Sequence, residues 1–210
     1  MLENIWLFLD AFTINLRVGS IALLIGLLIG FASALLRARN RSATAKLTGF
    51  FVGFLRAFPV YVLMFVAVNL LASLGLFDAL TSKQSAEAAL VIALSAYTIS
   101  TCSDAWLAFL QNRDQGQHSQ AWLVIPNLIQ IYVITVMSSS VGAAIGLQEA
   151  VTFTLNLAES LPTRNERLLL VFLVVLFFAT IMGLTRWGVK RVSAMVTQAQ
   201  TKRSSAPRSA

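Results

Sequence analysis

The stretch VGSIALLIGLLIGFASALL, residues 18–36, decides the fold class, because it holds no charged residue over its whole length. A second stretch, LLLVFLVVLFFATIMGL at residues 168–184, has the same character. About 20 apolar residues in a helix cross the ~30 Å hydrocarbon core of a bilayer. Three more apolar blocks lie between these two, at residues 59–77, 86–110 and 121–147. The sequence therefore predicts an all-α membrane protein, a bundle of five transmembrane helices.

The composition and the placement of positive charge extend this prediction to topology. Hydrophobic residues make up 57 % of the chain and charged residues 12 %, and the mean hydropathy is +0.76. The net charge of +7 is concentrated at residues 37–46, at Arg113 and at residues 190–208. Because cytoplasmic loops carry the excess of Lys and Arg, we expect an outside N-terminus and a cytoplasmic C-terminus. We therefore interpret the positive charge as setting the topology and contacting membrane lipids, and not as binding nucleic acid.

The two ends of the chain differ from the apolar blocks. Acidic Glu3 and Asp10 argue against a signal peptide, and apolar residues recur at helical spacing, so residues 1–17 are predicted to form an amphipathic helix on the outer face. Residues 18–192 are predicted to form one five-helix transmembrane domain. Residues 193–210 are expected to be a disordered, basic cytoplasmic tail. The single cysteine, Cys102, is expected to be a small packing residue.

Small residues mark two places where helices are expected to approach closely. Gly26 and Gly30 form a small-xxx-small pair in the first block, and Gly142 and Gly146 form another in the fourth. Such pairs let two helix backbones come together in a membrane. We expect Gly142 and Gly146 to lie at an interface.

Polar residues inside the predicted spans gather in the third and fourth blocks. A polar group in hydrocarbon needs a partner, so these side chains should face protein or a water-filled path. Two interpretations stay open: the residues line a path for a solute, or they form hydrogen bonds that hold the bundle together. The candidates for the path are Tyr97, Ser100, Ser103, Asn127, Ser138, Ser139 and Ser140.

Three further residues are candidates for an interface at the cytoplasmic side. Asp104 lies near the cytoplasmic end of its predicted span, where capping or an ion pair with Arg56 or Arg113 is at least as well supported as substrate contact. Arg56 and Pro59 precede the apolar run of the second block. Proline suits the first turn of a helix, and Arg can extend to the membrane surface.

Together these motifs resemble the permease subunits of ABC importers for polar amino acids. Residues 54–59, FLRAFP, look like the Phe-Arg-x-x-Pro motif that opens the family's second span, and Ala96-Tyr97 matches its Ala-Tyr pair. Residues 138–141, SSSV, fall where the family has Asp-Thr-Ser-Leu, and residues 146–149, GLQE, where a short apolar stretch ends in an acid. The family's Glu after the Ala-Tyr pair is replaced here by Ser100.

One departure from the family concerns the loop between the third and fourth spans. Family members carry there a pair of short cytoplasmic coupling helices that docks on the ATPase. Two short helices and a turn need about 20 residues. The loop from Gln111 to Gln120 has ten, and the Glu of the coupling motif is missing. The loop is thus a shortened, degenerate form, and the chain should not bind an ATPase in the usual way.

The resemblance implies an importer subunit of the bacterial inner membrane. It would be the non-coupling half of a heteromeric pair, working with a second permease subunit that has a complete coupling loop, an ATP-binding subunit and a solute-binding protein. The solute would be an amino acid or a similar small polar molecule. The alternative is a structural or regulatory membrane subunit, descended from a permease, that contacts no substrate.

An enzyme is the third interpretation, and the sequence argues against it. No P-loop, no Gly-x-Ser-x-Gly turn and no Cys or His pair at metal spacing is present. The lone histidine, His118, has only Asp114 nearby as a second ligand. We therefore expect no catalytic residue, no metal site and no cofactor.

Overall fold

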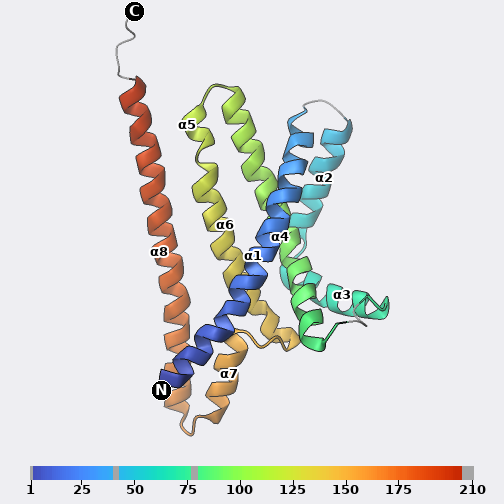
Figure 1. Cartoon of the computed structure of the whole chain (residues 1–210), viewed down its shortest axis with the longest axis vertical. Helices are drawn as coiled ribbons and strands as arrows, with labels where there is room; N and C mark the ends of the chain where they lie inside the picture. The colour runs from blue at the N-terminus through green and yellow to red at the C-terminus, as the bar shows by residue number, and fades with distance from the viewer. Residues whose placement is uncertain (1, 40–42, 77–79, 205–210) are drawn as a thin grey trace, which may run out of the picture.

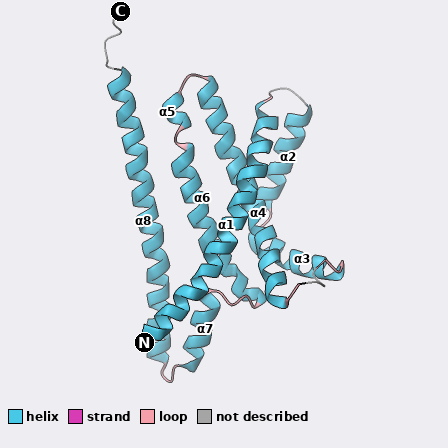
Figure 2. Ribbon diagram, in the orientation of Figure 1, coloured by secondary structure: helices cyan, strands magenta, loops and turns pink. Residues whose placement is uncertain are grey.

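The computed structural model describes residues 2–39, 43–76 and 80–204. No strand occurs among these residues, which form helices joined by short connections (Figure 2). The all-α prediction is confirmed. The elements are α1 (Leu2–Ala38), α2 (Ala43–Ala57), α3 (Val60–Ser73), α4 (Ser82–Asp114), α5 (His118–Ala121), α6 (Val124–Ser138), the 3₁₀ helix η1 (Ser139–Ile145), α7 (Ala150–Ser160) and α8 (Arg164–Ser204).

Four of the five predicted spans are confirmed by single helical segments. Each of these is long and apolar enough to cross a membrane: Glu3–Ala38, Ser82–Asp114, Val124–Ile145 and Arg164–Met195. The described residues hold a fifth span only if α2 and α3 are counted together as one broken span. The side on which each terminus lies stays a prediction.

The prediction of a second span over residues 59–77 needs correction. Helix α3 begins at Val60 and ends at Ser73, a length of about 21 Å that falls short of the hydrocarbon core. It meets α2 at an angle of 94°, so it lies across the direction of the long helices (Figure 1). The break occurs at Pro59, the extended N-cap residue of α3, because proline lacks the N–H that would continue α2.

The predicted ends also differ from the structure. Helix α1 runs without a break from Leu2 to Ala38, so residues 2–17 form no separate helix. The predicted place of residues 1–17 on the outer face stays a prediction, and Met1 lies outside the described residues. Helix α8 runs to Ser204, so residues 193–204 are helical and not disordered. No Gly or Pro interrupts residues 189–204, and Ala, Gln, Lys and Arg favour a helix there. Residues 205–210 lie outside the described residues.

The core lies where α1 crosses α4, and the predicted Gly26 and Gly30 pair makes that crossing close. A Cβ atom on Gly26 would lie 2.5 Å from the Thr98 side chain, and one on Gly30 would lie 2.9 Å from Cys102. The Thr98 hydroxyl donates a hydrogen bond of 2.7 Å to the Ala22 carbonyl. Small residues therefore allow backbone contact between the two longest buried segments.

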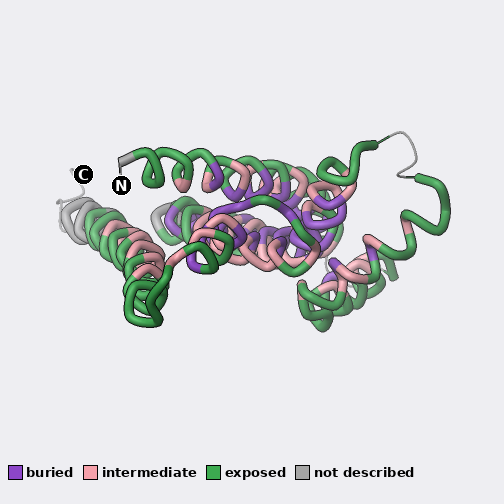
Figure 3. Tube along the Cα trace, turned by 90° about the horizontal axis from the view of Figure 1, so that it is seen from below, coloured by how far each residue is buried: buried purple, intermediate pink, exposed green. Residues whose placement is uncertain are grey.

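Two groups of buried side chains extend along α4 from this crossing. One packs Leu90 and Leu94 against Val18 of α1 and Met64 of α3. The other places Cys102 beside Ile131 of α6, and this free thiol is fully buried, as expected of a packing residue. Helix α8 and the α2–α3 pair lie at opposite edges and are mostly exposed (Figure 3).

Candidate functional site: polar contacts between the helices

The three α4 candidates differ in what surrounds them. Ser100 and Ser103 are fully buried. The Ser100 hydroxyl donates to the Tyr97 carbonyl of its own helix at 2.8 Å, and the Ser103 hydroxyl accepts from Arg37 at 2.8 Å. The Tyr97 side chain is half-buried and packs against the apolar group around Cys102. The two serines are thus engaged inside the chain.

The candidates on α6 and η1 also differ in how far they are buried. Asn127 is exposed near the start of α6, and Ser138 at its end is half-buried. Ser139 is buried, and its hydroxyl donates to the Val136 carbonyl at 2.7 Å. The Asn15 amide donates to the Ser139 hydroxyl at 2.9 Å and to Ser140 at 3.4 Å. The seven candidates therefore differ in burial and in hydrogen-bond partners.

Asn15 and Glu149 form a buried polar network that sequence reasoning did not identify as a site. Both side chains are at most 1 % exposed. The Asn15 amide donates to the Glu149 carboxylate at 2.9 Å, and the Asn15 carbonyl oxygen accepts from the Ala150 N–H at 3.2 Å. The contacts join α1, η1 and the start of α7. Asn15 stands three residues before the uncharged run at residues 18–36, and nothing in that position indicates its partner.

The Glu149 carboxylate is stabilised by hydrogen bonds at the N-terminus of α7. It accepts from the backbone N–H groups of Val151 and Thr152, each at 3.0 Å, as the N-cap residue of that helix. A carboxylate at this position satisfies N–H groups that have no partner within the helix and interacts favourably with the helix dipole. The Glu149 carboxylate therefore connects the start of α7 to Asn15 of α1 through hydrogen bonds.

Asp104, ten residues before the end of α4, forms the centre of a charged cluster. It pairs with Arg37 of α1 at 2.8 Å and with Arg56 of α2. The expectation of an ion pair with Arg56 is confirmed, whereas Arg113 instead pairs with Asp114 at 3.5 Å. The cluster ties α1 and α2 to α4, and two guanidinium groups around one carboxylate leave one net positive charge.

The remaining interface candidates lie at backbone features. Pro59 occupies the break between α2 and α3. Gly142 is buried against Leu90, where a Cβ atom would come within 2.8 Å of that side chain. Gly146 instead ends η1 with a φ of +78°, a left-handed conformation that glycine adopts without strain. Of the predicted pair, Gly142 therefore packs closely against a neighbouring side chain, whereas Gly146 forms a turn.

The connection between α4 and α6 is short in the structure as in the sequence. Helix α4 ends at Asp114, and Gly116 turns the chain with a φ of +74°. Between this turn and α6 lies α5, which has four residues, a single helical turn. The segment therefore contains no pair of helices.

Two of the cavities between the described helices have no candidate path residue in their linings. One, of about 400 Å³, lies between α1, α7 and α8. The other, of about 180 Å³, lies between α1, α6 and α8 and is lined by residues such as Phe12 and Phe178. Within the described part of the chain, no group of three His, Cys, Asp or Glu side chains is placed to hold a metal ion.

Comparison with known proteins adds one finding on the fold. Neither protein-family models nor curated protein sequences gave a match. A crystal structure of an amino acid ABC transporter with histidines is similar to this chain, with a TM-score of 0.66 and 18 % sequence identity. The likeness covers 91 % of this chain and 96 % of that chain. The two chains therefore share a fold over nearly their whole lengths.

Proposed function

We propose that this chain is a permease-type transmembrane subunit of a binding-protein-dependent ABC importer in the bacterial inner membrane. The observation that carries the proposal is the fold shared with a chain of an amino acid ABC transporter over 91 % of the present chain. The order of motifs from FLRAFP to GLQE supports it. The imported solute would be an amino acid or a similar small polar molecule.

The second part of the proposal is that the chain is the non-coupling half of a heteromeric pair. The single turn of α5 supports this, because it offers no helix pair that could dock on an ATPase. A second permease subunit with a complete coupling loop would contact the ATP-binding subunit. Alternating access needs two bundles to rock about a shared site, and one coupled bundle can drive both.

The burial of the polar residues suggests a division of roles within this proposal. Ser100, Ser103 and Ser139 are buried and hydrogen-bonded inside the chain. Ser103 and Ser139 accept from Arg37 and Asn15 of α1 and so join helices, whereas the Ser100 hydroxyl bonds within α4. Tyr97, Asn127 and Ser138 keep exposed surface. We propose that these last three face the path, with Ser140 beside them.

A structural subunit that contacts no solute is the second candidate. The engagement of three of the seven polar candidates inside the chain favours it. Under this function, the described polar contacts would maintain one half of a complex whose path lies in another subunit.

Purification from the native membrane in a mild detergent tests the proposal. We expect an ATP-binding subunit and a second permease subunit to accompany the chain, and the reconstituted complex to import a solute in an ATP-dependent way. Recovery of the chain alone, as a monomer in the membrane, would contradict it.

Two variants of path candidates, Asn127→Ala and Tyr97→Phe, with one control variant, then separate the two candidate functions. Asn127→Ala should raise the KM for solute import about fivefold, the loss expected for one hydrogen bond. Ser160→Ala, at the exposed end of α7, is the matched control and should change nothing. If Asn127→Ala and Tyr97→Phe leave KM and solute preference as they are, the structural function is supported instead.

A further inference from the structure

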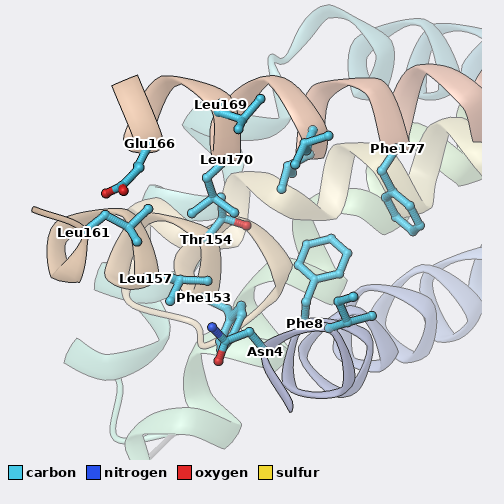
Figure 4. A pocket seen from close by; sticks show the side chains of 13 residues that line it. Asn4, Phe8, Phe153, Thr154, Leu157, Leu161, Glu166, Leu169, Leu170 and Phe177 are labelled. Carbon is cyan, nitrogen blue, oxygen red and sulfur yellow. The ribbon is translucent and has the colours of Figure 1, made fainter. Parts of the chain in front are cut away.

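The larger cavity is an elongated groove between the N-terminal part of α1, helix α7 and the first turns of α8. Its volume is about 400 Å³, and its walls are mainly aliphatic and aromatic side chains from all three helices (Figure 4). We name it the α7–α8 groove. Its principal lining residues are Phe8, Phe153, Leu157, Leu170, Leu173 and Phe177.

The two ends of the α7–α8 groove differ in chemistry. Glu166 lies at one end and Phe177 at the other (Figure 4). The Phe8 ring contacts Phe177 edge-on at 5.2 Å between centroids, which makes the second end aromatic. These ends are eleven residues apart on α8, about 16 Å of helix. The groove is thus long and mainly apolar, and Asn4, Thr154 and Glu166 are its polar lining residues.

A polar solute or a chain of waters would find few partners in this groove. The hydroxyl of Thr154, one of its few polar lining groups, donates to the Ala150 carbonyl of its own helix at 2.7 Å. Apolar cavities stay dry, because a bound water needs two or more polar partners. The lining from Leu169 to Phe177 belongs to the candidate span Arg164–Met195, which has the highest hydropathy of the four single-helix spans.

The first turn of α8 supplies charges of both signs beside the polar end. Glu166 accepts a hydrogen bond from the Thr163 N–H at 3.4 Å, which fixes its carboxylate over the helix start. Arg164 and Arg167 are exposed in the same turn, and Arg167 is held by its Nε donating to the Leu161 carbonyl at 2.9 Å. One turn thus presents a carboxylate and two guanidinium groups at the boundary of an apolar helix.

We propose that the α7–α8 groove binds an acyl chain of a phospholipid whose headgroup carries a primary amine. The acyl chain extends from Glu166 toward Phe177, the ammonium group pairs with Glu166, and the phosphate lies near Arg164 and Arg167. A carboxylate favours a hydrogen-bonding ammonium over a quaternary one, and Arg suits phosphate. The inference goes beyond the proposed function, because it requires only that the chain lie in a membrane.

Lipid binding to the full chain, purified with any subunits that accompany it, tests the acyl-chain part. Native mass spectrometry would count phosphatidylethanolamine molecules retained after delipidation and titration. Leu170→Trp fills the groove and should lower the apparent affinity about tenfold, since two buried CH₂ groups account for that much. Leu168→Trp is the matched control, because Leu168 is 58 % exposed and does not line the groove. It should bind as the unaltered chain does.

The headgroup part is tested with Glu166→Gln, which keeps an acceptor for the Thr163 N–H. The unaltered chain should bind phosphatidylethanolamine more tightly than phosphatidylcholine, and the variant should lose about fivefold of that preference. Glu159→Gln, at an exposed position of α7, should keep it. Equal retention in Leu170→Trp and Leu168→Trp, equal binding of the two lipids by the unaltered chain, or a cross-link from the groove to another polypeptide would each overturn the proposal.

Discussion

At the scale of single residues, the buried carboxylate of Glu149 is held by hydrogen-bond donors from α1 and from the start of α7. Its two oxygens accept from the Asn15 amide and from two backbone N–H groups of α7. Burial of such a group is costly unless each lone pair is matched. The arrangement therefore depends on both oxygens being acceptors.

This dependence makes Glu149→Gln a sharp test. A Gln amide places an NH₂ group against a donor, so the free energy of unfolding should fall by about 2 kcal/mol, the size of a charged hydrogen bond left unmade. Denaturant titration of the purified chain in detergent measures the change. Glu159→Gln, which alters an exposed residue of α7 in the same way, should stay within about 0.5 kcal/mol of the unaltered protein. Equal effects of the two substitutions would show that the network is not stabilising.

At the scale of helices, the contact between α1 and α4 depends on the absence of side chains. Gly26 lies against the Thr98 side chain, and Thr98 in turn bonds to the α1 backbone at Ala22. In a membrane, packing and hydrogen bonds of this kind drive helix association, because lipid is as apolar as the side chains. The predicted glycine pair thus has a definite structural role.

Gly26→Ala should therefore destabilise the chain. The new Cβ would lie 2.5 Å from the Thr98 Oγ1 and Cβ atoms and 2.8 Å from its backbone carbonyl carbon, so the helices must separate. We expect a loss of about 2 kcal/mol, typical of overpacking, in the same denaturant titration. Gly183→Ala in α8 is the control, since no atom lies within 4 Å of its Cβ position, and it should be neutral or slightly stabilising. A neutral Gly26→Ala would contradict the close crossing.

The elements also show where a sequence pattern is ambiguous. The apolar block at residues 59–77 has the composition of a span but folds as the short α3, set at 94° to α2. Hydropathy counts apolar residues and carries no information on direction. Pro59 marks the place of the break, and Met64 of α3 packs in the same buried cluster as Leu90 of α4.

At the scale of the whole molecule, the orientation in the membrane is the prediction that most needs a direct test. The chain has one cysteine, Cys102, which is fully buried, so Cys102→Ala gives a background without thiols. Ser160→Cys should react with a membrane-impermeant maleimide in intact cells. Gln115→Cys should react only after permeabilisation, because the predicted cytoplasmic side contains residues 111–120. Both positions are exposed in the chain. The opposite labelling pattern would invert the predicted topology.

The sequence by itself determined the fold class, the four confirmed spans and the kinds of residue that bring helices together. Long uncharged runs have one stable arrangement in a bilayer, because only helices satisfy their own backbone there. It also named Arg56 as one of two cations that could pair with Asp104, and the structure shows that ion pair. These features are local in the chain and can be read along it.

The tertiary structure alone decided which polar residues meet. Asn15 contacts Ser139 and Glu149 across more than 120 positions of sequence, and periodicity on one helix says nothing of its partner helix. The same reason separates the seven path candidates into buried contacts, such as Ser100 and Ser103, and exposed groups, such as Asn127. Which face of a helix is buried depends on how the whole bundle packs, and apolar lipid and apolar protein select the same side chains.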